Sequence, residues 1–240
     1  GLGLAYAIIV GLGALLGTLV PLFVQHRSQV SGRTLVEILL GVVAMILGIA
    51  LSTWGGQIRE DASRTKILSV STDRYLIAVL LAILCGLMAP MLNFSFAFGQ
   101  DIAHQAVLHG NSELRAGYAV WPIGLAGGFI PNIAYSLFLL RRNKSWSLFS
   151  GGSRDIFLAA LMGILWMGAF AIYGVSATYL GALGTSIGWG LMQIFMIMTA
   201  MLSGVFTGEW KHAPRSSLWL FSSGFACLVI ATGLLATGNH

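Results

Sequence analysis

The chain has 240 residues, of which 57% are apolar and 9% are charged, and its mean hydropathy is +0.85. Soluble domains carry about 25% charged residues, so this composition excludes an ordinary water-soluble globular protein and indicates a membrane protein. The net charge of +5 does not indicate nucleic-acid binding, because the basic residues lie in short loops beside apolar runs, where lipid head groups are their expected neighbours.

Seven apolar runs are long enough to cross a bilayer as helices, since a hydrocarbon core of about 30 Å requires roughly 20 helical residues. We expect spans at about 2–23, 34–54, 75–98, 116–140, 155–177, 183–207 and 217–236. The sequence therefore predicts an all-α integral membrane protein with about seven transmembrane helices. The segment 100–115 is expected to extend the third helix or to lie at the membrane interface. Thr34 and Glu37 have the spacing of a capping box at the start of the second helix.

The positions of Lys and Arg indicate how these helices are oriented, since short cytoplasmic loops carry the excess of positive charge. Ten basic residues lie in the loops after the second, fourth and sixth helices: Arg59, Arg64, Lys66, Arg74, Arg141, Arg142, Lys144, Arg154, Lys211 and Arg215. Three lie on the opposite side: Arg27, Arg33 and Arg115. This distribution predicts that the first set of loops is cytoplasmic and that the C-terminus is periplasmic.

An offset of 183 residues places the first two helices on the last two. It aligns Tyr6 with Trp189, Gly41 with Gly224 and Leu51 with Leu234. Shared hydrophobicity alone could give such matches, but two inverted five-helix repeats would also produce them. On this interpretation, residues 1–54 form the last two helices of one repeat, residues 55–74 a cytoplasmic loop, and residues 75–240 the second repeat. Three helices would then precede residue 1.

Polar and aromatic residues share faces of the third to sixth predicted helices. The candidate substrate-binding residues are Asn93, Trp121, Asn132, Tyr135, Trp166, Tyr173, Trp189 and Gln193, and Ser186 shares the face of the last two. An amide inside a bilayer must find a partner, and a neighbouring helix is one alternative. The other is a sugar, whose hydroxyl groups pair with amides and whose C–H faces stack on aromatic rings.

Few ionisable residues could carry a proton, and the candidates are Asp101, His104 and Glu209. None lies clearly at the bilayer midplane, where an ionisable group marks function, so the residues alone do not establish proton coupling. The sequence contains no nucleotide-binding loop, paired catalytic carboxylates, metal-ligand cluster or nucleophile triad on a plausible scaffold. We therefore expect no enzymatic activity, no cofactor and no metal.

Seven runs of residues resemble the L-rhamnose/proton symporter family. They are GTLVPLF (17–23), LCGLMAPMLNFSFAFG (84–99), GGFIPNIAY (127–135), RRNKSW (141–146), LMGILWMGAFAIYG (161–174), LGALGTSIGWG (180–190) and TGEWK (207–211). They cover nearly the whole chain in order. That family belongs to the drug/metabolite transporter superfamily, so the resemblance implies ten helices in two inverted five-helix repeats, of which the seven found here would be the fourth to the tenth.

The resemblance implies import of L-rhamnose or a similar deoxy sugar by proton symport across the bacterial inner membrane. Two alternatives stay open. The superfamily also permits an exporter of drugs or metabolites, which an apolar cavity without amides would favour. A chain without the first three helices of the fold could instead be a non-transporting membrane fragment or an interaction protein, since those helices would be expected to complete the cavity.

The charge distribution predicts which loops a reagent can reach from outside the cell. In a chain whose native cysteines are replaced by alanine, a cysteine introduced near Arg64 or Arg142 should react with a membrane-impermeant maleimide only after permeabilisation. A cysteine at His240 should react in intact cells. The reverse labelling pattern would overturn the predicted orientation.

Overall fold

The structure is a computed structural model that describes residues 2–26, 30–63, 72–150 and 152–238. Its helices are α1 (Leu2–Gln25), α2 (Gly32–Ser63), α3 (Thr72–Met88), α4 (Met91–Phe98), α5 (Gln100–Leu108), α6 (Glu113–Ala116), α7 (Trp121–Arg142), α8 (Ser153–Tyr179), α9 (Gly184–Phe206) and α10 (Arg215–Thr237). Short 3₁₀ turns lie at Gly117–Ala119, Trp146–Ser150 and Gly181–Leu183. The described residues contain helices and turns but no strand.

Seven helical segments of the described chain are long and apolar enough to cross a membrane, which confirms the predicted fold class. They are Leu4–Gln25, Gly32–Ala62, Leu76–Leu108, Glu113–Arg142, Ser153–Tyr179, Gly181–Phe206 and Arg215–Thr237. The third segment consists of α3, α4 and α5, because turns at Ala89–Pro90 and at Gly99 interrupt the helix. Proline lacks the N–H that a continuous helix would use, which explains the first interruption. The segment 100–115 begins with α5, so it does continue the third span as helix.

The described structure differs from the predicted boundaries around α2. This helix continues to Ser63, so the first part of the predicted loop 55–74 is helical and carries Arg59 and Glu60. The segment 64–71, Arg27 and His240 lie outside the described residues.

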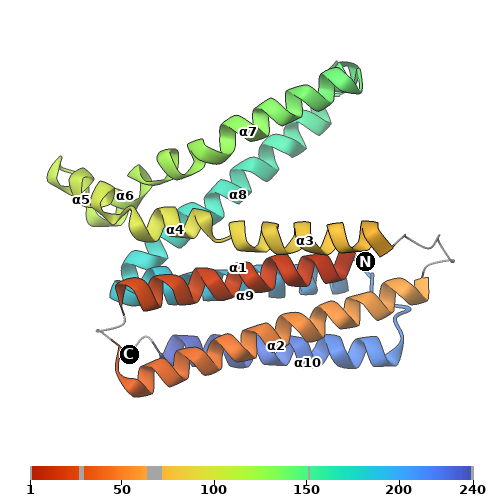
Figure 1. Ribbon diagram of the computed structural model, residues 1–240, viewed down its shortest axis with the longest axis horizontal. Helices are drawn as coiled ribbons and strands as arrows, with labels where there is room; N and C mark the ends of the chain where they lie inside the picture. The colour runs from red at the N-terminus through yellow and green to blue at the C-terminus, as the bar shows by residue number, and fades with distance from the viewer. Residues whose placement is uncertain (1, 27–29, 64–71, 151, 239–240) are drawn as a thin grey trace. The chain divides into compact units, whose positions relative to one another are not determined.

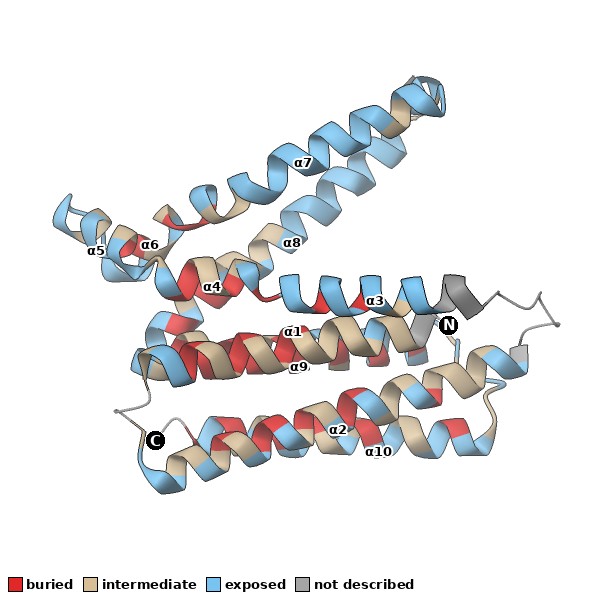
Figure 2. Ribbon diagram, in the orientation of Figure 1, coloured by how far each residue is buried: buried red, intermediate tan, exposed pale blue. Residues whose placement is uncertain are grey.

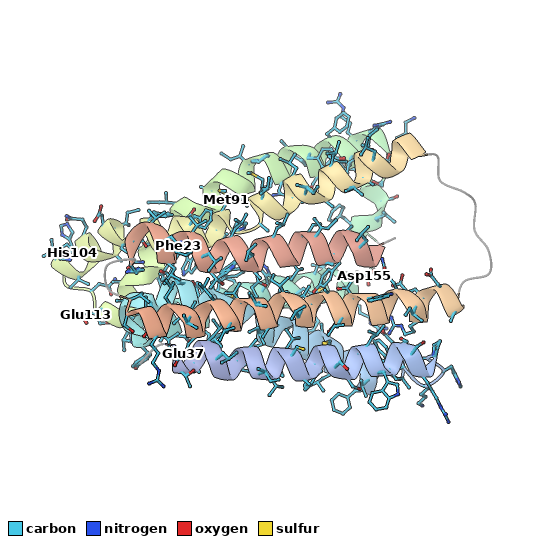
Figure 3. The ribbon with its side chains drawn as sticks, turned by 60° about the horizontal axis from the view of Figure 1, so that its bottom comes forward. Phe23, Glu37, Met91, His104, Glu113 and Asp155 are labelled. Carbon is cyan, nitrogen blue, oxygen red and sulfur yellow. The ribbon has the colours of Figure 1, made fainter. Side chains whose placement is uncertain are left out.

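The predicted capping box at the start of α2 is wrong, because the helix begins before Thr34. The Ser31 Oγ accepts the Thr34 N–H at 3.2 Å, and Glu37 forms an ion pair with Arg33 at 3.0 Å. Figure 3 labels Glu37 near this end of α2.

The chain divides into two compact units, which are described separately. Unit 1 comprises residues 1–93 and 180–240, and unit 2 comprises residues 94–179. In unit 1, α2 lies along α10 and α1 lies along α3 and α9 (Figure 1). Most of the buried residues line the inner faces of these unit 1 helices (Figure 2).

The helices α2 and α10 form the most extensive helix–helix contact in the described chain. Small residues on each helix face larger residues on the other. A Cβ atom added to Gly48 would lie 2.8 Å from the Leu228 side chain, and one added to Gly41 would lie 2.9 Å from that of Leu235. Residues with higher numbers on α2 contact residues with lower numbers on α10, so the two helices are antiparallel. The small residues let the two backbones approach closely, as they do in membrane helix pairs.

The small residues of α2 and α10 correspond through the 183-residue offset that the sequence suggested. Gly41, Gly48 and Gly55 on α2 correspond to Gly224 and Ala231 on α10 and to Gly238, the C-cap residue of α10. The contacts correspond as well: Gly41 faces Leu235 as Gly224 faces Ser52, and Gly55 faces Phe221 as Gly238 faces Ile38. This correspondence of contacts follows from the antiparallel packing with a constant register, which any offset would satisfy, so the repeat stays a prediction from the sequence.

The helices α1, α3 and α9 form the other side of unit 1. A Cβ on Gly86 of α3 would lie 2.9 Å from Leu12 of α1. The Trp189 indole ring of α9 occupies the space beside Gly17 of α1, where no larger residue would fit. Glycines therefore set the distance between α1 and the two helices α3 and α9.

Unit 2 contains α5 to α8, and most side chains of α7 and α8 are exposed (Figure 2). Large apolar residues such as Phe129, Ile130 and Leu165 are among them. Apolar exposure over whole helices is expected where a bilayer covers the surface. The buried part of unit 2 is an aromatic cluster at the start of α7, described below.

The tight fit of α10 against α2 predicts different outcomes for two glycines of α10. Gly224→Leu should lower the free energy of unfolding by about 1 to 3 kcal/mol or more, because a Cβ there would lie 2.8 Å from the Ser52 backbone nitrogen, which cannot rotate away. Gly233→Leu is the matched control, since nothing lies within 4 Å of its added Cβ. Thermal unfolding of the two purified variants measures the difference. An equal loss of stability in the two variants would contradict the predicted interface.

Candidate functional site

Asn93 on α4 cross-links two helices through its side-chain amide. Its Nδ2 donates hydrogen bonds to the carbonyl oxygen of Gly17 at 2.8 Å and to that of Thr185 at 3.0 Å. The side chain is completely buried. Both of its donors are therefore used inside the protein, and the residue ties α1 to the start of α9.

Trp189 on α9 has a similar position. Its indole Nε1 donates to the carbonyl oxygen of Gly13 at 3.0 Å, and its ring lies against Gly17. The ring is buried in the layer formed by α1 and α9. Trp189 and Asn93 therefore approach the same turn of α1 from two directions, and both have protein partners for their N–H groups.

Gln193, one turn further along α9, differs from these two residues. It is 7% exposed, and its Oε1 has no hydrogen-bond partner among the described residues. The hydroxyl oxygens of Thr18 and Ser186 are also buried without a partner in the described chain. The Thr18 Oγ1 lies 3.0 Å from where a Cβ on Gly190 would be, so it faces α9 between Ser186 and Gln193. We refer to Thr18, Ser186 and Gln193 as the polar seam.

The polar seam requires a physical explanation. A buried polar atom without a partner costs about 1 to 3 kcal/mol, and most such atoms in native proteins are satisfied by protein or by water. The cost is greater in a bilayer, where bulk water is absent. Three such atoms on facing sides of α1 and α9 therefore make the polar seam a candidate site for water or a polar ligand.

A pocket with a volume of about 530 Å³ lies in unit 1 between α1, α2, α9 and α10. Its volume is within the range of roughly 300 to 1,000 Å³ that is typical of ligand sites. It is lined by Ala5, Tyr6, Ile9, Ile49, Ser52, Thr53, Gly56, Arg59, Glu60, Ile197, Ala200, Met201, Gly204, Glu209, Trp210 and Phe221. Ile197 follows Gln193 by one helical turn, so the polar seam and the pocket occupy successive turns of α9.

Charged and aromatic side chains gather in one part of this pocket. Arg59 of α2 forms an ion pair with Glu209 at 2.9 Å, and its guanidinium lies 4.6 Å from the centre of the Trp210 ring. Trp210 also packs on Phe221 of α10, with ring centres 4.1 Å apart. Arginine over an aromatic ring is a favourable cation–π arrangement. These contacts fasten the end of α2 to the turn between α9 and α10.

Unit 2 brings three of the predicted aromatic residues together. Trp121 of α7 stacks on Phe96 of α4, with ring centres 4.8 Å apart and planes 4° from parallel. Tyr173 of α8 lies 5.7 Å from Phe96. Trp166 contacts Phe170 at 4.7 Å, and Phe170 in turn contacts Trp121. The Trp121 Nε1 is buried without a partner among the described residues.

Two other predicted site residues interact within their own helix. The Asn132 Nδ2 donates to the Gly128 carbonyl oxygen at 2.7 Å, and Tyr135, which is 63% exposed, stacks near Phe138. These contacts of Asn132 and Tyr135 lie within α7 and do not connect either residue to the aromatic cluster of unit 2.

The three proton-carrier candidates also have different positions. Asp101 and His104 are exposed on α5, and His104 projects outward from that helix (Figure 3). Glu209 pairs with Arg59 and lines the pocket.

Sequence reasoning missed four residues of unit 1. Tyr6, Arg59 and Trp210 line the pocket, and Thr18 belongs to the polar seam. The offset that aligns Tyr6 with Trp189 could have indicated Tyr6. Arg59 could not be found, because its importance depends on α2 extending beyond residue 54.

Comparisons with known proteins give a consistent result. A protein-family model described as L-rhamnose-proton symport protein matches residues 1–239. The chain is 24% identical to the L-rhamnose-proton symporter of Shigella boydii over 250 residues, and 24% identical to that of Klebsiella pneumoniae over 247 residues. Each match covers 99% of this chain and 71% of the relative. No solved structure matches the chain.

The contacts of Asn93 predict a structural effect that Asn132 should not have. Asn93→Leu keeps a similar volume but removes two buried interhelical hydrogen bonds, so it should lower the free energy of unfolding by about 1 to 3 kcal/mol. Asn132→Leu should change it by less than about 0.5 kcal/mol, because that side chain is exposed and bonds to its own helix. Thermal unfolding of both purified variants tests this, and a similar loss of stability in each would contradict it.

Proposed function

Because the chain belongs to the L-rhamnose-proton symport protein family, we propose that it imports L-rhamnose or a related deoxy sugar together with protons across the bacterial inner membrane. The family match over residues 1–239 and the seven membrane-spanning segments support this function. Relatives named L-rhamnose-proton symporter support the sugar and the coupling ion. The structural observation that carries the proposal is the polar seam, because it offers unpaired hydrogen-bonding atoms inside the bilayer.

The chemistry of the polar seam suits a sugar. The Gln193 Oε1 is an acceptor for a sugar hydroxyl, and the hydroxyl groups of Thr18 and Ser186 can donate or accept. A bound hydroxyl would satisfy atoms that otherwise remain unpaired in an apolar surrounding.

The proposed residues differ in how much the structure supports them. Gln193 and Trp166 are the strongest candidates, because the first has an unpaired acceptor and the second is 52% exposed beside Phe170. Asn93 and Trp189 use their N–H groups to hold helices together, so we propose that they shape the site. Trp121, Tyr173, Asn132 and Tyr135 stay predicted binding residues.

We propose that transport proceeds by alternating access of two inverted halves, in which α1 and α2 are equivalent to α9 and α10. The sequence offset of 183 residues, which aligns Gly41 with Gly224, supports this relation. The charge distribution supports a cytoplasmic location for the end of α2 and the turn between α9 and α10, and a periplasmic C-terminus. Glu209 is the proton-carrier candidate that lines a pocket, so we propose it ahead of Asp101 and His104.

A drug exporter is the second candidate, and one observation favours it. The pocket near Arg59 combines apolar walls with the carboxylates of Glu60 and Glu209, a combination that also suits a lipophilic cation. An exporter would not accumulate sugar inside cells. Transport direction and substrate therefore separate the two functions.

The proposed function predicts sugar uptake driven by a proton gradient. The protein expressed with its complete coding sequence should accumulate labelled L-rhamnose in vesicles, and a protonophore should abolish the accumulation. Absence of gradient-driven accumulation of L-rhamnose or any related deoxy sugar would contradict the proposed function.

The site assignment predicts weaker sugar binding for each folded molecule. Gln193→Ala should weaken recognition by about 1 to 3 kcal/mol, and Trp166→Ala should weaken it through lost ring contact. Val229→Ala, an exposed residue of α10, is the control and should bind normally. Unchanged sugar affinity in both site variants would reject the site while leaving the transport function intact.

A further inference from the structure

We propose that the pocket between α1, α2, α9 and α10 is a second sugar site, at which the transported sugar is held on the cytoplasmic side of the polar seam. This inference rests on the proposed function and on the orientation predicted from the charged loops. It assigns binding to Tyr6, Arg59, Glu209 and Trp210, of which Glu209 alone was a candidate, and then only as a proton carrier. The site is contained entirely within unit 1.

The distribution of side chains in the pocket matches a molecule with one apolar edge and several hydroxyl groups. Ile9, Ile49, Ile197 and Met201 form apolar walls from three helices. Ser52, Thr53, Arg59, Glu60 and Glu209 supply polar groups in the part contributed by the later turns of α2 and the turn after α9. A deoxy sugar could place its methyl group against the walls and its hydroxyls among the polar side chains.

The ion pair is suited to hold hydroxyl groups. Arg59 and Glu209 meet through one N–O contact of 2.9 Å, and their side chains are 20% and 54% exposed. A carboxylate has about four lone-pair sites, so this contact leaves further acceptor capacity on Glu209 for sugar hydroxyl groups. The Tyr6 ring is partly exposed in the same pocket and offers a face for C–H groups.

The charge of the pocket favours a neutral ligand over an anion. Two carboxylates, Glu60 and Glu209, line it together with one guanidinium, Arg59. An added anion would meet an excess of negative charge in a site that is only partly open to water, where charge repulsion is poorly screened. A neutral polyhydroxy molecule meets no such repulsion, and its hydroxyls can bond to both signs of charge.

The proposed repeat gives a reason for the location. The offset of 183 residues relates Gly17 and Trp189 to Ala200 and Tyr6. At the first pair, the indole fills the space between α1 and α9. At the second pair, the equivalent space is a pocket that both residues line. One end of the α1–α9 layer is therefore filled and the other is open, as expected when an inverted-repeat transporter exposes its substrate path to one side.

Two other occupants are possible outcomes of an experiment. A lipid acyl chain would fill the apolar walls but would leave the polar side chains without bonds, and a lipophilic cation would use the carboxylates and rings without using the guanidinium. A sugar is the occupant that would use the apolar walls, the carboxylates and the guanidinium together. The test must therefore include all three ligands.

Cysteine protection tests the site directly. Thr53→Cys places a thiol in the pocket, and Ala62→Cys places one on the same helix, exposed and outside the pocket. Both are made in a protein with the complete coding sequence and with Cys85 and Cys227 replaced by alanine. L-rhamnose should slow maleimide alkylation of the first thiol at least threefold and leave the second unchanged. Tetraphenylphosphonium and added phospholipid are tested in parallel.

A filled pocket provides the second measurement. Ala200→Trp should occupy the pocket and reduce the sugar protection of Thr53→Cys to background. Ala160→Trp on α8, exposed and outside the pocket, is the matched control and should keep the protection. Thermal unfolding confirms that both proteins are folded. If Ala200→Trp does not fold, Glu209→Gln serves instead, with at least a threefold loss of sugar affinity expected.

The outcomes separate the pocket from the proposed function. Sugar protection that disappears in Ala200→Trp, or that weakens in Glu209→Gln where that variant takes its place, supports the pocket. Protection by tetraphenylphosphonium or phospholipid without protection by sugar would overturn it. Normal gradient-driven uptake with no sugar protection at Thr53→Cys would also overturn it while leaving the proposed function standing. Sugar protection in a protein that shows no uptake would support the pocket and reject the symport function.

Discussion

The close approach of antiparallel helices at glycine is the interaction on which unit 1 depends. Lipid tails are as apolar as the side chains of a membrane helix, so burial of apolar area gives little reason for two helices to associate. Close packing and interhelical hydrogen bonds must therefore stabilise the association. The helices α2 and α10 approach at Gly48 and Gly224, and the buried Ser217 hydroxyl donates to the Gly55 carbonyl oxygen at 2.6 Å. This packing also sets the end of α2 beside the turn that follows α9, where Arg59 pairs with Glu209.

Buried polar residues of unit 1 are of two kinds, and their hydrogen bonds distinguish them. Asn93 and Trp189 donate to backbone carbonyl oxygens of neighbouring helices, so their polarity serves helix association. Thr18, Ser186 and Gln193 have buried oxygens that no described residue satisfies. In a bilayer such atoms are costly, which is why they indicate bound water or substrate more strongly than the satisfied amide does. A side-chain amide thus has a structural role at Asn93 and a proposed ligand role at Gln193.

On the proposed repeat, the two ends of the α1–α9 layer differ because corresponding positions carry different residues. Trp189 has a glycine opposite it and fills the space, whereas Tyr6 has Ala200 as the counterpart of that glycine and lines an open pocket. Around Tyr6, Arg59 and Trp210 add groups from α2 and from the turn after α9. The proposed repeat therefore supplies a shared framework, and the substitutions within it supply a site with a distinct chemistry at one end.

The sequence by itself determined the number and approximate limits of the membrane helices, because hydrocarbon requires long apolar segments whose backbone bonds are internal. It also indicated the family and the offset between α1–α2 and α9–α10. Only the tertiary structure showed that Asn93 bonds to two backbone carbonyl oxygens while Gln193 retains an unpaired oxygen, since both are simply amides within apolar runs. It also decided that Arg59 meets Glu209, residues 150 positions apart. Helical periodicity places a side chain on a face of its helix, but packing against other helices selects the partner that the face meets.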